Sequence, residues 1–246
     1  HYCGGRAARR GRAEATGVVK GASRGVGREL RAAVADEGAD VGGCARDGAA
    51  LGDAVAAAND GAAGHAEGVS ANVQSERAVA DVVGAAIDAG DRDEIDVVVA
   101  NAGVNHGTPG EMPLHGESYD RFDDTLATNL RGVFTVAKEA NDAMPEAGRI
   151  LVPSGSIAVD PKPGMGAYAV SKAAAEGLVR QLSVDLAQVA AVVDPGMVDT
   201  DLSGSGGRDP EDVAPMFVWA AAHADAEEID GERVDLRAWK RATRSR

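Results

Sequence analysis

The chain has few of the residues that define several classes of protein. Cysteine occurs only twice, at Cys3 and Cys44, too seldom for a disulfide framework and without the spacing of a metal-binding pair. The five histidines are scattered along the sequence, so we expect no metal site. No apolar run approaches the roughly 18 residues that a membrane helix needs, and the arginines near the start precede no apolar stretch. We therefore expect a cytoplasmic protein with no membrane partner and no export signal.

Basic residues are also scarce, except at the two ends of the chain. Residues 1–13 hold four basic and no acidic residues, and residues 237–246 hold five basic and no acidic residues. The body between them, residues 14–236, carries 16 basic and 39 acidic residues, a net charge of −23. Such a charge repels nucleic acid and anionic membranes, so we expect neither as a partner, with binding of nucleic acid through the basic ends as an alternative. An acidic surface of this kind is typical of proteins from salt-loving organisms, and the bias of a GC-rich genome is the other explanation.

Strands and helices alternate between these ends. Stretches that predict strands lie at 18–20, 39–46, 65–73, 95–103, 148–154 and 189–193, and helical patterns separate them, among them 75–89, 124–141 and a last one at 211–224. The stretch at 95–103 is nearly continuously apolar, as expected for a strand buried on both faces of a parallel sheet. The alternation predicts a single α/β domain, a doubly wound parallel sheet with helices on both faces.

Three glycines, Gly21, Gly25 and Gly27, follow the first expected strand and open the first helical pattern. Glycine has no Cβ, so a phosphate can approach the backbone closely, and the free amides of a helix N-terminus stabilise its negative charge. A strand, such a turn and a helix are typical of a dinucleotide site, although glycines also mark turns without any ligand.

Tyr168 and Lys172 lie four residues apart in a helical pattern, and only three tyrosines occur in the whole chain. Residues at this spacing share one face of a helix, so both side chains can point into the same cleft. A nearby ammonium favours the phenolate, so we expect Lys172 to lower the pKa of Tyr168 and to suit it to acid–base chemistry.

Six motifs resemble those of the short-chain dehydrogenase/reductase family, classical type. They are KGASRGVG at 20–27, ANAG at 100–103, TNLRGVF at 128–134, SGSIAV at 154–159, YAVSK at 168–172 and PGMVDT at 195–200, and the resemblance covers roughly residues 16–235. It implies a Rossmann-like fold and an enzyme that acts on CH–OH groups with NAD(P) as acceptor. We expect a basic N-terminal tail at 1–13, a dinucleotide-binding and catalytic domain at 14–236, and a basic C-terminal tail at 237–246.

The resemblance also assigns roles to four side chains. It implies that Tyr168 protonates a carbonyl oxygen as hydride arrives and that Ser156 holds that oxygen by a hydrogen bond. Asn129 would support a water-linked proton path, and Lys172 would hold the nicotinamide ribose. The substrate class that the family favours is a ketone or 3-oxoacyl group, reduced to a secondary alcohol. A protein that binds NADP(H) as a sensor or structural element, without catalysis, is the alternative.

The choice of cofactor depends on the end of the second expected strand. An acid there accepts hydrogen bonds from the ribose 2′-hydroxyl and repels a 2′-phosphate, whereas an arginine attracts the phosphate. Arg46 follows this strand and Arg24 lies in the glycine turn, so we expect NADP(H), with NAD(H) as the alternative and with solvated surface arginines as the simpler reading. With the residues that the resemblance implies, the expected cofactor contacts are Gly21, Ser23, Arg24, Gly25, Val26, Gly27, Arg46, Asn72, Val73, Asn101, Ala102, Gly103, Tyr168, Lys172, Pro195, Gly196, Val198 and Thr200.

The sequence departs from the family pattern at three places. Lys20 stands where the glycine turn usually has a small hydroxyl residue. The family serine falls at Gly155, so we choose Ser156 over Ser154 because the letters SIA follow the family pattern. The connection between residues 187 and 195 is about three residues short, which we expect to truncate the approach to the sixth strand.

Two loops and two helices complete the expectations. His106, His115, Met197 and Leu202 should border the substrate, and residues 203–210 form either a mobile lid or a simple loop. The hydrophobic helices around 121–144 and 165–187 should pair across a subunit interface, giving a homodimer or homotetramer.

Overall fold

The computed structural model describes residues 15–89 and 93–244, so the tail expected at 1–13 lies outside the described residues. Seven parallel strands form one sheet in the order β3-β2-β1-β4-β5-β6-β7. They are β1 (Thr16–Lys20), β2 (Asp40–Ala45), β3 (His65–Ser70), β4 (Val97–Ala100), β5 (Arg149–Pro153), β6 (Val189–Asp194) and β7 (Arg233–Asp235). The chain moves outward from β1 in one direction and from β4 in the other, so the sheet is doubly wound.

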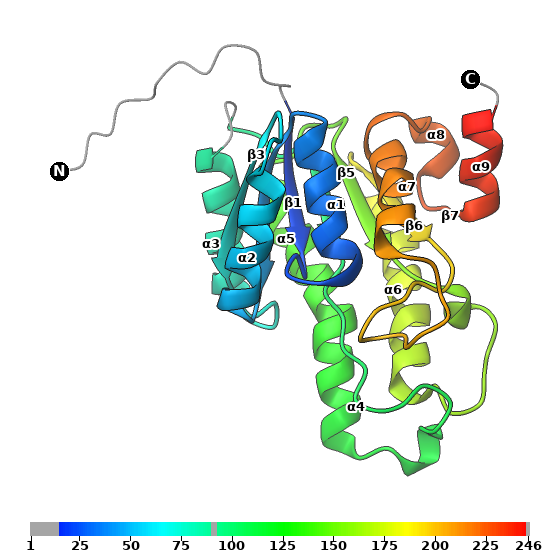
Figure 1. Cartoon of the computed structure of the whole chain (residues 1–246). Helices are drawn as coiled ribbons and strands as arrows, with labels where there is room; N and C mark the ends of the chain where they lie inside the picture. Colours follow the sequence, from blue (N-terminus) through cyan, green and yellow to red (C-terminus); the bar gives the residue numbers. More distant parts are fainter. Residues whose placement is uncertain (1–14, 90–92, 245–246) are drawn as a thin grey trace.

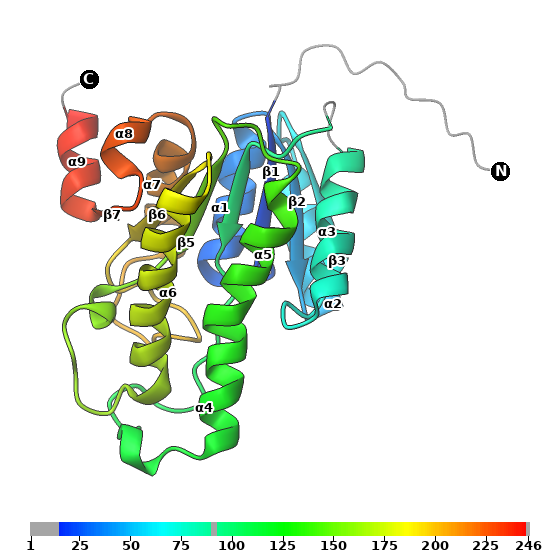
Figure 2. The same ribbon diagram turned by 180° about the vertical axis from the view of Figure 1, so that it is seen from behind.

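Helices cover both faces of this sheet (Figures 1 and 2). One layer consists of α1 (Gly25–Asp36), α2 (Gly48–Asn59) and α7 (Pro210–Ala222), and the other of α3 (Glu76–Ala89), α5 (Gly132–Asn141) and α6 (Gly166–Asp185). Leu30 and Phe217 are buried beneath the first layer, and Val136 and Val179 beneath the second. The predicted fold class, a single α/β domain with helices on both faces of a parallel sheet, is confirmed.

The helix predicted at 124–141 is longer and is interrupted by a wider turn. It begins as α4 (Tyr119–Leu126), passes through the π-helical segment η2 (Ala127–Arg131) and continues as α5. Asn129, inside η2, is buried, and its amide binds the backbone of Val104 in the loop after β4. A π turn holds an extra residue, which changes the direction of the side chains in it. The irregularity therefore coincides with a residue that the motifs single out.

The connection into the sixth strand is short, but the strand is complete. α6 ends at Asp185, β6 begins at Val189, and the first five residues of β6 pair with all five of β5. The approach to the sixth strand is therefore short, as expected, whereas the strand itself is not shortened. Among the described residues, no helix is long and apolar enough to cross a lipid bilayer.

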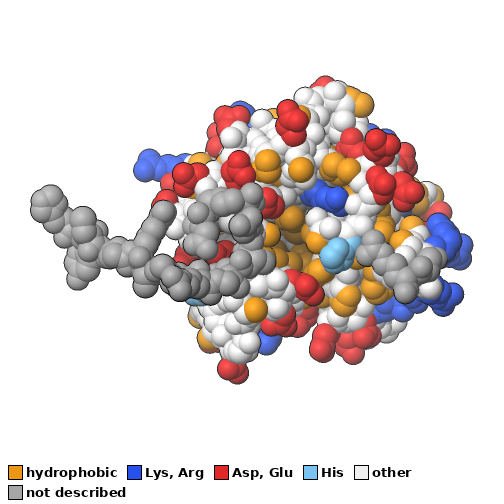
Figure 3. Space-filling model, turned by 90° about the horizontal axis from the view of Figure 1, so that it is seen from above, with side chains coloured by type: hydrophobic (Ala, Val, Ile, Leu, Met, Phe, Trp, Pro, Cys, Tyr) orange, Lys and Arg blue, Asp and Glu red, His pale blue; other side chains and the backbone are white. Residues whose placement is uncertain are grey.

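The C-terminal region contains three elements that the sequence analysis did not predict. They are α8 (Ala226–Ile229), the three-residue strand β7, and α9 (Leu236–Arg244), which holds most of the segment expected as a tail. Trp239 of α9 packs against the core while Arg237 and Lys240 are exposed, so the helix is amphipathic. Figure 3 shows the basic side chains gathered over α9 at the right, with acidic side chains spread over the rest of this face.

Lys20, at the carboxyl end of β1, is an unusual core residue. Its side chain is 0% exposed, and its Nζ has no hydrogen-bond partner among the residues that the structure describes. The ammonium end occupies space that Gly132 leaves open, because a Cβ on Gly132 would lie 2.7 Å from Nζ. Burial is the main reason that the pKa of Lys20 is lowered to about 7; the charge interaction with Cys44 opposes the shift, and repulsion from Lys172 contributes a smaller part of it. The residue thus resides in the core at a cost to stability.

Candidate functional site

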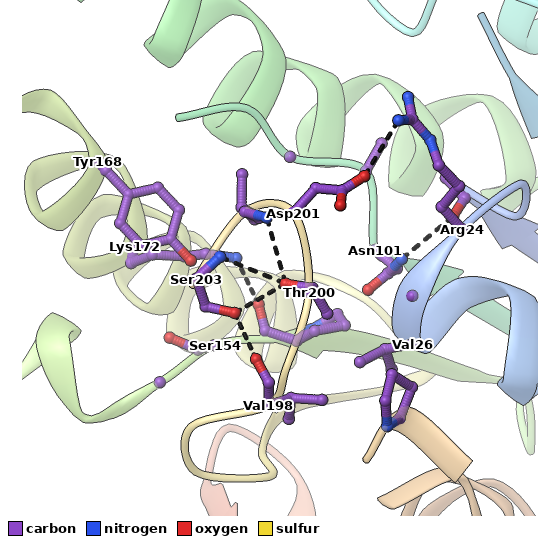
Figure 4. Close-up of a pocket in the computed structure, with 18 of the residues that line it drawn as sticks. Arg24, Val26, Asn101, Ser154, Tyr168, Lys172, Val198, Thr200, Asp201 and Ser203 are labelled. Carbon is purple, nitrogen blue, oxygen red and sulfur yellow. Dashed lines mark hydrogen bonds and ion pairs between the residues drawn. The ribbon is translucent and has the colours of Figure 1, made fainter. Parts of the chain in front are cut away.

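A cavity of about 920 Å³ opens at the carboxyl edge of the sheet (Figure 4). Its walls come from the loops that follow β1, β2, β4, β5 and β6 and from helix α6. β1 and β4 are neighbours in the sheet, but the chain leaves them in opposite directions. The crevice at such a switch point is where doubly wound sheets bind ligands. The cavity therefore lies where the topology predicts a ligand site.

The glycine turn between β1 and α1 forms one wall of the cavity. Gly21 and Gly25 have positive φ angles, +73° and +54°. A Cβ on Gly21 would lie 2.9 Å from the Cα of Ala102, and a Cβ on Gly27 would collide with the carbonyl oxygen of Gly21. α1 begins at Gly25, and no side chain caps its first amides. These free backbone donors border the cavity and fit the pyrophosphate of a dinucleotide.

Tyr168 and Lys172 both reach the cavity from the first turns of α6, as their spacing predicts. The Nζ of Lys172 donates to the carbonyl oxygen of Pro153 at 2.9 Å and lies 5.7 Å from the centroid of the Tyr168 ring. Burial lowers the pKa of Lys172 to about 8, against the opposing effect of Glu176.

The pKa of Tyr168 moves in the direction opposite to our expectation. We predicted that the Lys172 ammonium lowers it, but burial raises it to about 12. Desolvation of the phenolate is the cause, because the phenol is half-buried in the cavity wall. Tyr168 is consequently a neutral phenol near pH 7, a state that can donate a proton.

The two candidate serines lie in different surroundings. Ser154 directly follows β5 and is 9% exposed, and its hydroxyl donates to Oε1 of Glu176 at 2.6 Å. Ser156 opens the short 3₁₀ turn η3 (Ser156–Ala158) and lines the cavity. Within residues 15–89 and 93–244, its hydroxyl forms no hydrogen bond with another group of the protein. Ser156 is therefore the serine whose hydroxyl is available to a ligand, although Ser154 also borders the cavity.

Behind Ser154 lies a charged network that the motifs did not reveal. Arg233 of β7 forms ion pairs with Glu176 and, at 2.7 Å, with Asp194. The other carboxylate oxygen of Asp194 accepts from the amide of Gly196 at 2.9 Å. The network thus joins the serine at the end of β5 to the turn after β6. Only the position of Glu176, one helical turn after Lys172, could have suggested it from the sequence.

Asn129 lies behind the cavity wall and does not line it. Its Oδ1 accepts from the amide of Val104 at 2.8 Å, and its Nδ2 donates to the carbonyl oxygen of Val104 at 2.9 Å and to Ser171 at 3.0 Å. These bonds engage the whole amide group. In this structure Asn129 fastens the loop after β4 to α6.

The loop after β6 forms the opposite wall of the cavity and is held together by its own hydrogen bonds. The hydroxyls of Thr200 and Ser203 are 2.7 Å apart, and Ser203 also donates to the carbonyl oxygen of Val198. The Cγ2 of Thr200 lies 3.0 Å from the position of a Cβ on Gly25, so the loop touches the glycine turn. The two expected cofactor walls therefore face each other across a narrow opening.

Most of the expected cofactor residues line this cavity. Gly21, Ser23, Arg24, Gly25, Val26, Arg46, Val73, Asn101, Ala102, Gly103, Tyr168, Lys172, Pro195, Gly196, Val198 and Thr200 do so, whereas Gly27 and Asn72 do not. Gly27 instead lies inside α1, and the Oδ1 of Asn72 accepts from the amide of Gln74 at 3.1 Å.

The substrate side of the cavity was only partly expected. Met197 and Leu202 line it, but His106 and His115 do not. His106 instead binds Asp124 of α4 at 2.6 Å. The lining residues that sequence reasoning missed include Ile157, Lys162, Pro163 and Met165. They come from loops and a helix end, where no periodic pattern marks them.

Comparison with known proteins supports a single family. The family described as short chain dehydrogenase matches residues 16–211. The chloroplastic NADPH-dependent aldehyde reductase-like protein of Arabidopsis thaliana is 32% identical over 79% of this chain and 76% of that protein. A 3-oxoacyl-[acyl-carrier-protein] reductase of Synechocystis is 29% identical over 87% of this chain and 85% of that protein. The crystal structure of a short chain dehydrogenase from Burkholderia cenocepacia in complex with NADP has a TM-score of 0.80 and 26% identity, covering 92% of this chain and 97% of that one.

Proposed function

Because the chain belongs to the short chain dehydrogenase family and is an oxidoreductase that acts on CH–OH groups with NAD(P), we propose that it uses NADP(H) to interconvert a ketone or 3-oxoacyl group and a secondary alcohol. The observation that carries the proposal is the convergence of Tyr168 and Lys172 on the cavity that the glycine turn borders. A 3-oxoacyl substrate is supported by the similarity to the Synechocystis reductase.

The roles of the side chains follow from their environments. When bound, the nicotinamide supplies the hydride, and the protein must supply a proton. Tyr168 keeps its phenolic proton because burial raises its pKa to about 12, so it can donate to the carbonyl oxygen as that oxygen gains negative charge. The Lys172 ammonium beside the ring stabilises the tyrosinate that remains. Ser156 holds the substrate oxygen with its free hydroxyl.

The preference for NADP(H) is supported by the charges at the adenosine end of the cavity. Arg24 and Arg46 both line it. Asp47, the nearest acid after β2, is engaged as the N-cap of α2, where its carboxylate accepts from the amide of Ala50 at 3.1 Å. The Burkholderia relative, whose structure contains NADP, is consistent with this preference.

We expect fluorescence titration to show tighter binding of NADPH than of NADH, by about tenfold, because one charge-assisted hydrogen bond to the 2′-phosphate is worth that factor. The titration is made in multimolar KCl and repeated at low salt, because concentrated salt screens the repulsion among the acidic side chains of residues 14–236. Equal or tighter binding of NADH would refute the assignment. Binding of NADPH without turnover of any 3-oxoacyl thioester or ketone would favour the non-catalytic alternative, to which the altered turn at Lys20 points.

The two serines allow a direct test of the oxygen-binding role. We expect Ser156→Ala to lower kcat by about 100-fold, the usual cost of removing one donor to a developing oxyanion. Ser154→Ala should lower kcat by less than about tenfold, because the Ser154 hydroxyl already donates to Glu176 and affects the site only through packing. Steady-state kinetics at saturating NADPH provide the measurement. The reverse order of the two effects would assign the role to Ser154.

Assembly and location are further parts of the proposal. We propose a homodimer or homotetramer in which α5 and α6 meet their copies, supported by the exposed Phe134 (46%), Val170 (37%) and Val184 (74%) on these helices. The mass in solution tests this.

A reducing, cytoplasmic setting suits the free thiol of Cys44, so we propose this location. We also propose residues 14–236 as the catalytic domain, followed by the basic helix α9.

A further inference from the structure

An ion pair crosses the mouth of the cavity. Nη1 of Arg24, in the glycine turn, lies 3.1 Å from Oδ2 of Asp201, in the loop after β6 (Figure 4). The two side chains are 67% and 83% exposed, and 177 residues separate them in the sequence. Both residues line the cavity. The pair therefore joins the two walls between which a dinucleotide would lie.

The loop that carries Asp201 is closed mainly on itself. The amide of Asp199 donates to the carbonyl oxygen of Arg208 at 2.8 Å. The amide of Arg208 donates to the carbonyl oxygen of Met197 at 2.9 Å. The amide of Gly207 donates to the carboxylate of Asp199 at 3.2 Å. Because these bonds are internal, the loop keeps its shape when the pair between Arg24 and Asp201 breaks. Among the described residues, this ion pair joins the loop to the glycine turn by charge, beside the contact of Thr200 with Gly25.

The charges at this end of the cavity show what the pair does to an anionic ligand. Three arginines line it: Arg24, Arg28 and Arg46. Arg28 has Glu29 3.7 Å away, and Arg24 has Asp201. In the part of the chain that the structure describes, Arg46 has no ion-pair partner. A phosphate that reaches Arg24 must therefore replace a carboxylate of the protein.

We propose that Asp201 is a specificity-determining residue that competes with the cofactor's 2′-phosphate for Arg24. The inference rests on the proposed use of NADP(H). The phosphate displaces the carboxylate and thereby frees the loop after β6, whereas a ligand with a 2′-hydroxyl leaves the ion pair in place. Asp201 thus lowers the affinity for phosphorylated cofactor and couples cofactor identity to the mobility of the loop beside the substrate. Because both partners are exposed, the pair is weak enough to be exchanged.

Two nucleotides that differ only in the 2′-phosphate isolate this effect: adenosine 2′,5′-bisphosphate and adenosine 5′-monophosphate. We expect Asp201→Asn to tighten binding of the bisphosphate by about fivefold, the upper range for a surface ion pair, and to change binding of the monophosphate by less than about twofold. The matched control is Asp212→Asn in α7, which removes the same charge from an exposed residue that does not line the cavity. Isothermal titration calorimetry measures both affinities.

A double-mutant cycle completes the test. We expect Arg24→Gln to weaken binding of the bisphosphate. It should also abolish the effect of Asp201→Asn, because the Asp201 carboxylate then has no guanidinium for which to compete with the phosphate. Equal gains for both nucleotides, an equal gain from Asp212→Asn, or additive effects in the double variant would each overturn the inference. If the wild-type protein binds neither nucleotide, the proposed NADP(H) function fails too. If it prefers the bisphosphate but Asp201→Asn leaves this preference unchanged, the inference alone fails.

Discussion

Replacement of Tyr168 by phenylalanine is expected to lower kcat for carbonyl reduction by about a thousandfold, within the range that a positioned general acid contributes. The substitution removes only the hydroxyl, and with it the proton that the substrate oxygen requires. The ring remains in the same half-buried site against Lys172, so the affinity for NADPH should stay within about twofold of the wild type. Stopped-flow and steady-state rates of NADPH oxidation, with a fluorescence titration of the cofactor, provide the measurement.

Tyr119 offers the matched control. It is 90% exposed at the start of α4 and does not line the cavity, so Tyr119→Phe should leave both kcat and cofactor affinity unchanged. If Tyr168→Phe retains wild-type turnover, the proton comes from another group and the catalytic assignment is wrong. If it loses cofactor affinity as well as turnover, Tyr168 mainly shapes the cofactor site.

Lys20→Met is expected to stabilise the protein at pH 6 by at most roughly 5 kcal/mol, because one pKa unit corresponds to about 1.36 kcal/mol. The pKa of Lys20 falls from 10.5 to about 7 on folding, mainly because burial penalises its charge. Methionine has a similar unbranched shape, fills the same space beside Gly132 and needs no hydrogen bond. The Lys20 ammonium in the core therefore lowers the stability of the folded protein, and an apolar residue of the same shape should raise it.

The gain should depend on pH in a defined direction. The pKa of Lys20 is lower in the folded than in the unfolded protein, so between about pH 7 and pH 10.5 the unfolded chain binds more protons. The wild type therefore becomes more stable as the pH rises through this window, and the advantage of Lys20→Met should shrink. Urea unfolding of both proteins at pH 6 and pH 9.5 measures it. Lys138→Met, at an exposed position on α5, is the control, and a pH-independent difference would contradict the explanation.

The sequence predicts the sheet, its helical layers and the glycine turn because these depend on local patterns. Alternation of strand and helix fixes the winding of the sheet, and Gly21 and Gly27 mark where backbone segments touch. The spacing of Tyr168 and Lys172 places both on one helix face, whatever the rest of the fold does. The parts of the site that come from one element are therefore accessible to sequence reasoning.

The remaining features depend on contacts between distant segments. The π turn holds Asn129, whose side chain is hydrogen-bonded to Val104, 25 residues earlier in the chain. The segment β7 is a strand only because β6 pairs with it. The sign of the pKa shift of Tyr168 depends on its burial in the folded protein, which no local pattern records. Arg24 and Asp201 lie 177 residues apart, so sequence reasoning could assign Arg24 to a phosphate but could not see its competitor.

The position of Arg233 has a consequence for the synthesis of the enzyme. β7 is the last strand of the sheet, and its arginine neutralises Glu176 and Asp194, which are both buried. A nascent chain that has not yet released β7 from the ribosome holds these two carboxylates without a partner, and breaking such a buried pair costs several kcal/mol. The cavity wall behind Ser154 therefore becomes stable only after β7 has joined the sheet. A chain that ends before β7 is therefore expected to stay unstable and open to degradation.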